Sequence, residues 1–393
     1  MDVSEQHGEA SQINLRRQHQ FDFYGSGTEY FRIWLANILL TLLTLGVYSA
    51  WAKVRRMKYF YENTALMGAR FGYHADPKKI LIGRIFAILT VGGFYLLAYY
   101  YPVIEPVGSI IWVAALPVLL SFALYFRLRN TSYRGLRFVF VGTLKQSYQT
   151  LWLPLTLALF GLIALALVMN QFAPGTMGLY LGILVFVTYL LFPILVMPLF
   201  HAQWKRYAHM HSFYGNVPFA FDATVKQYVK AYAGCIFVFL GIMIAFGLLA
   251  LIVVAGILGK TSAASKSSSI VRNLPEIFAL MAFLYAVLLT IAPYMKAVFF
   301  NLAWRNTQLG SHKFRADLPL WGMVSLAATN LLLVLVSLGF YRPFAVIRTQ
   351  RYLLEHLYIE SIEDDIEIFK TIDKTNPKAF SEGALDLFGE MDM

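Results

Sequence analysis

The chain has 393 residues, of which 58% are hydrophobic and only 14% are charged, and its mean hydropathy is +0.58. A soluble domain carries about 25% charged residues, so this composition excludes one and predicts a polytopic membrane protein. The single cysteine, Cys235, excludes an intramolecular disulfide framework. The net charge of +11 conceals an asymmetry, because residues 355–393 hold 11 of the 22 acidic residues. Basic loops beside apolar spans account for the remaining charge, and no nucleic-acid-binding module is recognisable.

Six apolar stretches are each long enough to supply the roughly 20 residues that cross a bilayer. They run from about Lys79 to Tyr101, Val107 to Phe126, Thr150 to Asn170, Met177 to Phe200, Ala231 to Gly259 and Pro275 to Phe300. The sequences between successive pairs are rich in Lys and Arg, whereas the connections within each pair carry little net charge. The positive-inside rule therefore predicts that each pair is a hairpin that enters the membrane from the cytoplasm and returns to it.

Two further apolar segments lie at the ends of this array and resemble each other. Residues 37–64 align without gaps with residues 330–357, so that Asn37 matches Asn330. The 17 residues that begin at Tyr30 could form one long helix, but too few apolar residues follow for a return crossing. We expect re-entrant or half-inserted segments with both chain termini cytoplasmic; a full span with both termini outside is the alternative. The predicted fold class is all-α, with six transmembrane helices and two short inserted segments, eight membrane segments in all.

A short pattern recurs along the chain, in which an Asn or His is followed eight residues later by a Phe. It occurs at Asn63 and Phe71, Asn130 and Phe138, His211 and Phe219, and Asn306 and Phe314. Alternating aromatic residues around Gly or Asn in these stretches predict small cytoplasmic β-hairpins. The pattern divides the chain into a polar N-terminal tail (1–20), a single membrane domain (21–358) and an acidic C-terminal tail (359–393). The membrane domain would hold five pseudo-repeats, over residues 21–63, 71–130, 138–211, 219–306 and 314–356.

The most specific stretch of the chain, residues 21–64, reads FDFYGSGTEYFRIWLANILLTLLTLGVYSAWAKVRRMKYFYENT, and FGYHADPKKILIGR follows at 71–84. With this block the chain resembles the YjgN-like family of bacterial inner-membrane proteins, which is defined by a domain of unknown function. The resemblance implies a multi-pass protein of the bacterial inner (plasma) membrane. It supplies no activity, substrate or catalytic residue.

Neutral polar side chains in the two terminal segments are the first candidates for a functional site. They are Asn37, Thr41, Thr44, Thr329 and Asn330. In lipid such groups need hydrogen-bond partners, so bonds between helices are the plainer interpretation. The functional hypothesis is that the two segments face each other and line a polar path for a solute.

Cationic side chains near the ends of the apolar segments are the second set of candidates. They are Lys53, Arg55, Arg56, Lys58, Arg84, His201 and Lys296. Side chains that reach toward the cytoplasmic headgroups explain them, and the alternative is a ring that attracts anionic solutes or lipid headgroups.

The sequence offers little for other chemistry. No Cys or carboxylate completes a metal site with His201, His209 and His211, and no hydrolase, kinase or nucleotide-binding motif is present. We therefore expect no metal, no cofactor and no enzymatic activity.

The leading hypothesis is a transporter or channel for a small anionic or amphiphilic solute. The alternative is a membrane-organising or lipid-binding scaffold that does not transport and that presents a cytoplasmic docking surface. A cavity lined by both Asn37 and Asn330 would favour transport, whereas asparagines paired in a closed core would favour the scaffold.

Overall fold

Ten short strands form the centre of the molecule. The computed structural model describes residues 17–101, 104–170, 196–259 and 274–361. The strands close an antiparallel barrel in the order β1-β10-β9-β8-β7-β6-β5-β4-β3-β2. They are β1 (Arg17–Phe23), β2 (Thr64–Leu66), β3 (Ala69–Tyr73), β4 (Thr131–Tyr133), β5 (Leu136–Phe140), β6 (Ser212–Tyr214), β7 (Val217–Phe221), β8 (Thr307–Leu309), β9 (His312–Ala316) and β10 (Leu357–Ser361).

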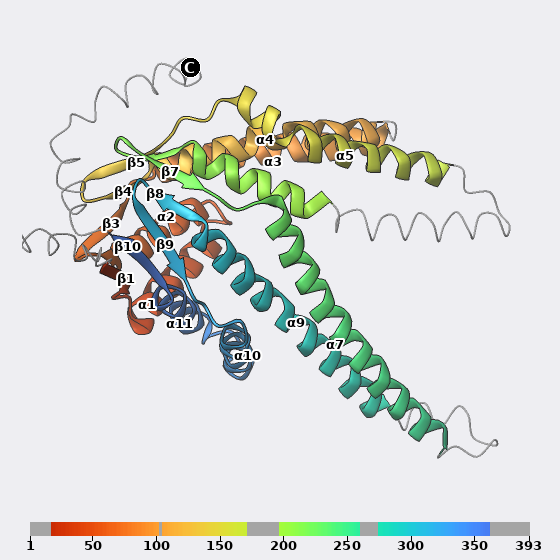
Figure 1. Cartoon of the computed structure of the whole chain (residues 1–393). Helices are drawn as coiled ribbons and strands as arrows, with labels where there is room; N and C mark the ends of the chain where they lie inside the picture. Colours follow the sequence, from red (N-terminus) through yellow and green to blue (C-terminus); the bar gives the residue numbers. More distant parts are fainter. Residues whose placement is uncertain (1–16, 102–103, 171–195, 260–273, 362–393) are drawn as a thin grey trace, which may run out of the picture.

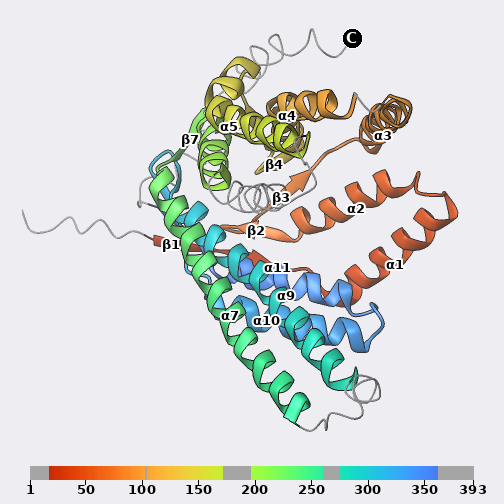
Figure 2. The same ribbon diagram turned by 90° about the vertical axis from the view of Figure 1, so that its right-hand side faces the viewer.

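Helices fill the intervals between the β-hairpins. They are α1 (Gly27–Leu43), α2 (Ser49–Glu62), α3 (Pro77–Tyr100), α4 (Ile104–Arg129), α5 (Leu144–Asn170), a helix over residues 196–210, α7 (Val225–Gly259), α9 (Leu274–Arg305), α10 (Leu320–Val336) and α11 (Arg342–Glu355). The longest helices project away from one side of the barrel, and α7 lies along α9 in both views (Figures 1 and 2). The barrel is thus a hub from which helical arms extend.

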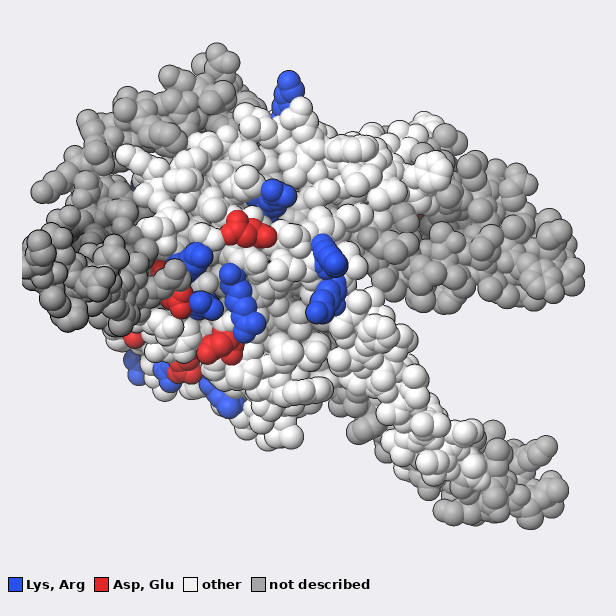
Figure 3. Space-filling model, in the orientation of Figure 1, with Lys and Arg blue, Asp and Glu red and all other residues white. Residues whose placement is uncertain are grey.

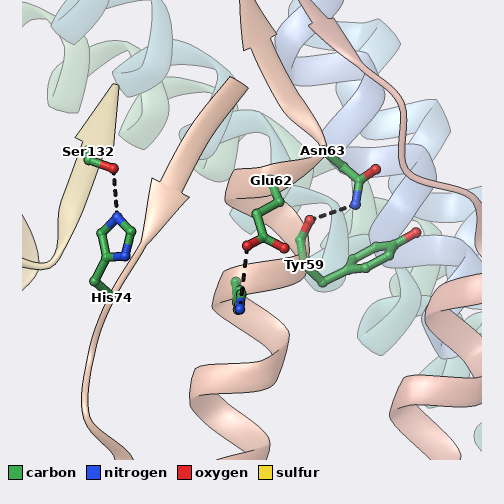
Figure 4. Close-up of polar contacts among 6 residues, drawn as sticks. Tyr59, Glu62, Asn63, His74 and Ser132 are labelled. Carbon is green, nitrogen blue, oxygen red and sulfur yellow. Dashed lines mark hydrogen bonds and ion pairs between the residues drawn. The ribbon is translucent and has the colours of Figure 1, made fainter. Parts of the chain in front are cut away.

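The Asn or His of the recurring pattern ends each helix that leads back into the barrel. Asn63 donates its side-chain amide to the Tyr59 carbonyl oxygen at 2.9 Å, as Figure 4 shows. The same bond to the carbonyl four residues earlier is made by Asn130, His211, Asn306 and His356. In the first unit the next residue, Thr64, bonds the Phe60 carbonyl in the same way, at 2.8 Å. These side chains satisfy carbonyls that a helix end leaves without an amide partner, which lets the chain turn directly into a strand.

Aromatic side chains fill the barrel. The four Phe residues of the pattern and Phe21 of β1 belong to its apolar core or pack against it; the four are Phe71, Phe138, Phe219 and Phe314. The Tyr133 ring lies 4.7 Å from that of Phe71, and its hydroxyl donates to the Leu66 carbonyl at 2.6 Å. The strands have three to seven residues, whereas a strand needs about 9–11 residues to cross a bilayer. The barrel is therefore a packed core and not a transmembrane pore.

The all-α prediction with eight membrane segments is wrong. The chain closes a ten-strand barrel, and within the described ranges three helical stretches are long and apolar enough to cross a membrane. These are Pro77–Tyr100, Ile110–Arg129 and Val225–Ile252, whereas Leu320–Val336 is a shorter apolar helix. The error arose because most strands of the barrel have only three to five residues and pair across intervals of many tens of residues, which hydropathy does not register. The span predicted at Met177–Phe200 lies mostly outside the described residues.

The surface of the projecting helices is apolar. No side chain of α3 is buried, and its exposed residues include Phe86 and Leu89. Figure 3 shows charged side chains gathered over the barrel and the helix ends beside it, while the arms are almost free of charge. Such a surface is stable in lipid and not in water, so the structure agrees with a membrane protein.

Strands β1 and β10 bring the two ends of the described chain together. Arg17 pairs with Ser361 in the antiparallel register, and the buried Glu360 forms an ion pair with Arg315 at 3.0 Å. The strands therefore extend into the stretches that the sequence assigned to the two polar tails.

Candidate functional site

The first and last helix pairs have the same turn. Gly46 joins α1 to α2 and Gly339 joins α10 to α11, each with a φ of 93°. The Thr44 hydroxyl accepts the Tyr48 amide at 2.9 Å. Ser337 accepts the Tyr341 amide at 2.8 Å in the second pair. Left-handed backbone favours glycine, and the hydroxyl fixes the start of the returning helix.

The two pairs meet where α1 packs against α11. The rings of Phe31 and Phe344 lie 5.8 Å apart, and a Cβ atom at Gly27 would overlap the Phe344 ring. Beside this contact, α1, α2, α11 and the barrel line an open cavity of about 970 Å³, which we call the terminal cavity. The barrel contributes Phe21 and Phe71 to its lining.

Four basic side chains line the terminal cavity. Lys53 and Arg56 come from α2, Arg84 from α3 and Arg342 from α11. The described residues that line the cavity include no Asp or Glu, and none of these four cations forms an ion pair with a described residue. Arg84 donates to the Ser49 hydroxyl. Among the described residues, nothing offsets the positive charge of the cavity.

The pKa of Tyr30 indicates that two of these cations lie close to its ring. Its side chain is buried in the first turns of α1. Burial raises the pKa of Tyr30, and the positive charges of Arg56 and Arg342 partly offset that rise. The two guanidinium groups, from helices far apart in the sequence, thus act on the same point of the cavity wall.

The remaining wall is apolar and opens to one side. Trp34, Ile38 and Leu42 form a stripe along α1, at the spacing of one helix face, and Val346 contributes from α11. Ile38 is 37% exposed and Leu42 is 68% exposed. The cavity thus combines an apolar stripe along α1 with basic side chains, of which Lys53, Arg56 and Arg342 are exposed.

The structure places two of the five candidate polar residues in the lining of the terminal cavity and three outside it. Asn37 and Thr41 line the terminal cavity, but Asn330, Thr329 and Thr44 do not. Asn330 is 6% exposed, and its side-chain oxygen accepts Arg348 at 2.8 Å. The hydroxyl of Thr329 bonds the carbonyl of Leu326 at 3.0 Å on the surface of α10. The two asparagines thus do not face one shared path.

Three of the seven candidate basic residues line the terminal cavity. Lys53, Arg56 and Arg84 line the cavity, whereas Arg55 and Lys58 are exposed outside it, and Lys58 pairs with Glu62 at 3.7 Å. Lys296 is exposed on α9, and it does not line the cavity.

His201 belongs to another part of the molecule. Its Nδ1 atom lies 3.2 Å from the Tyr232 hydroxyl, and its ring contacts Phe299. Within the described part of the chain, no three His, Cys, Asp or Glu residues are grouped so that they could hold a metal ion. His201 therefore packs among aromatic rings away from the terminal cavity.

Sequence reasoning missed Arg342, Ser49 and Trp34. A helical period was the available signal, because Ser49, Lys53, Arg56 and Phe60 recur every three or four residues and so share one face of α2. Arg342 occupies the position in α11 that corresponds to Ser49 in the gapless alignment.

Comparison with known proteins identifies the family to which the chain belongs. Residues 18–387 match the family described as "Bacterial protein of unknown function (DUF898)". The inner membrane protein YjgN of Salmonella typhimurium is 22% identical over 367 residues, which cover 89% of this chain and 90% of that protein. YjgN of Escherichia coli O157:H7 is 32% identical over 148 residues, and YjgN of E. coli K12 is 33% identical over 146, in each case 36% of both chains. No solved structure matches the chain. The chain is thus a member of the DUF898 family, whose curated relatives are inner-membrane proteins.

Proposed function

We propose that the protein is a carrier for an anionic amphiphile, whose headgroup binds in the terminal cavity. The observation that carries this proposal is the group of four cations that face the cavity without a carboxylate. Lys53, Arg56 and Arg342 are exposed and Arg84 is half-buried, so an anion that enters the cavity can reach all four. Arginine and lysine together provide the donors that phosphate and carboxylate oxygens accept.

The shape of the cavity supports an amphiphile over a free ion. The apolar stripe of α1 leads from the cations to the exposed side chain of Leu42. An acyl chain could leave along this stripe into the surrounding lipid while the headgroup remains inside. A carrier also agrees with the aromatic core of the barrel, which offers no aqueous route for a channel.

The charge distribution supports a multi-pass arrangement built from repeated units, with the barrel and both termini in the cytoplasm. Basic side chains gather on the helix ends next to the barrel, for example Arg127 and Arg129 on α4 and Arg305 on α9. Positive residues beside membrane helices favour the cytoplasmic side.

A paired set of variants tests the binding site. Lys53→Gln with Arg56→Gln removes two charges from the cavity lining, and Arg55→Gln with Lys58→Gln removes the same number from positions on the same helix that do not line the cavity. Titration of the detergent-solubilised full chain with short-chain phosphatidylglycerol, followed by native mass spectrometry, should show at least tenfold weaker binding for the first variant only. Equal affinities for the two variants would overturn the proposed site.

A second function, lipid binding without transport, is favoured by the closed environment of Asn330. Proteoliposomes that contain a fluorescent anionic lipid separate the two. A carrier accelerates the loss of fluorescence to external dithionite beyond the half that faces outward, and the Lys53→Gln, Arg56→Gln variant does so less. Binding without any acceleration would support the scaffold.

A further inference from the structure

The side-chain oxygen of Asn37 is an unsatisfied acceptor in the wall of the terminal cavity. Its Oδ1 atom is buried and has no hydrogen-bond partner, while the Nδ2 atom donates to the Ala52 carbonyl at 3.5 Å. Among the described residues that line the cavity, Asn37 is the one with such a buried atom. A buried carbonyl oxygen without a donor is unfavourable, so the site is poised to accept a hydrogen bond.

The corresponding residue of the second helix pair is fully satisfied. Asn330 donates to the Ala345 carbonyl at 3.3 Å and to the Thr349 hydroxyl at 3.2 Å, and its oxygen accepts Arg348. Ala345 corresponds to Ala52 in the gapless alignment, so the two asparagines share the bond that ties each pair together. The open oxygen of Asn37 is therefore specific to the first pair.

The two helix pairs differ in one arginine bond. Arg55 corresponds to Arg348 and both side chains are exposed, but Arg348 donates to Asn330 whereas the Asn37 oxygen has no partner. Arg56 stands where α11 has Thr349, and Lys53 stands where α11 has Val346. The first pair therefore adds two cations to the cavity lining at positions where α11 has uncharged residues.

We infer that Asn37 makes the terminal cavity selective for headgroups that carry both an anionic group and a hydrogen-bond donor, such as a hydroxyl or an ammonium. This inference rests on the proposed function and names the substrate class of that site. Lys53, Arg56 and Arg342 bind the anionic oxygens, which can only accept hydrogen bonds. Asn37 Oδ1 then accepts the O–H or N–H that lies beside the anionic group. A headgroup that lacks the donor leaves the oxygen unsatisfied and binds more weakly.

Two lipids of equal charge test the selectivity. Short-chain phosphatidylglycerol carries one negative charge and two hydroxyls, whereas phosphatidylmethanol of the same chain length carries one negative charge and no donor. The detergent-solubilised full chain should bind the first about tenfold more tightly, the equivalent of one hydrogen bond to a buried acceptor. Equal affinities would overturn the inference about Asn37 but would not contradict the proposed anion-binding site.

Variants separate the two claims. Asn37→Leu should bind the two lipids with equal affinity, and a single peak on size-exclusion chromatography in the same detergent shows that the variant is folded. Lys53→Gln with Arg56→Gln should weaken both lipids by similar factors and keep the preference. A preference that survives Asn37→Leu would overturn the inference, and a double variant that leaves both affinities unchanged would overturn the proposed function.

Competition with water-soluble phosphate esters distinguishes a lipid from a free phosphate ester as the ligand. Methyl glyceryl phosphate and dimethyl phosphate are phosphodiesters that carry the same two headgroups and one negative charge without acyl chains. We expect millimolar concentrations of neither to displace phosphatidylglycerol, because the apolar stripe of α1 then stays empty. Displacement by methyl glyceryl phosphate alone would support the role of Asn37 and overturn the amphiphile.

Discussion

His209 lies close to the barrel in an environment that opposes its protonation. Its Nδ1 atom donates to the Lys205 carbonyl at 2.8 Å, and its ring stacks on Phe221 at 4.7 Å. Burial lowers the pKa of His209 to about 4, and the positive charges of Lys205 and Arg127 act in the same direction. The hydrogen bond to the carbonyl raises the pKa of His209, but burial and charge repulsion together lower it by more.

His209 should make the protein sensitive to mild acid. Its pKa in the folded state lies below the unfolded value of about 6.5, so only the unfolded chain takes up a proton between pH 6.5 and pH 4. Stability is complete above that window and falls as the pH falls through it, by about 1 to 2 kcal/mol at pH 5. The drop in unfolding temperature from pH 7 to pH 5 should be smaller for His209→Gln than for the parent protein, and an equal drop would contradict this origin.

At the residue scale, sequence reasoning identified some of the polar and basic residues that line the terminal cavity. It selected Asn37, Lys53, Arg56 and Arg84 because polar and basic groups stand out in an apolar chain. It missed Arg342, whose place in the cavity depends on the packing of α11 against α1. It also paired Asn37 with Asn330, since an alignment detects similar surroundings but not which surface each residue faces.

At the scale of single elements, the turn between α1 and α2 depends on its glycine. Nothing lies within 4 Å of a Cβ atom built at Gly46, so a side chain there meets no steric obstacle outside its own backbone. The cost of substitution is therefore conformational, because a φ of 93° disfavours every residue with a Cβ.

Gly46→Ala should destabilise the protein by about 1 to 2 kcal/mol. Gly83, within α3, also has open space around its Cβ position but no positive φ, so Gly83→Ala should cost nothing. Thermal unfolding of the two variants in the same detergent makes the comparison. Equal losses would show that the positive φ at Gly46 does not decide the effect.

Local pattern predicted some elements and not their assembly. The Asn or His markers and the Phe residues eight positions later located the hairpins, because capping and alternation are local. Pairing between one hairpin and the next, such as Phe71 with Tyr133, leaves no trace in either segment. The closed barrel was therefore beyond the reach of the sequence.

At the scale of the whole molecule, the barrel fixes the relation between the two ends of the chain. Gln18 lies opposite Glu360 and bonds its carboxylate at 3.2 Å, so both ends must occupy the same side of the membrane. The proposed arrangement makes that side the cytoplasm.

Fusions to both ends test the arrangement. Green fluorescent protein at either end should fluoresce and alkaline phosphatase at either end should be inactive, because the former folds only in the cytoplasm and the latter only in the periplasm. Alkaline phosphatase placed between α3 and α4 should be active, since that connection lies at the far end of an apolar span. Active phosphatase at a terminus would overturn the cytoplasmic barrel.

The pairing of β1 with β10 also has a consequence for biosynthesis. The first strand to leave the ribosome waits for a neighbour that is translated more than 300 residues later, after every membrane helix between them. Until then the aromatic interior has an open seam, which exposes backbone groups that can join another chain. A message truncated before residue 357 would thus yield an inserted but unsealed protein, a natural target for quality-control proteases.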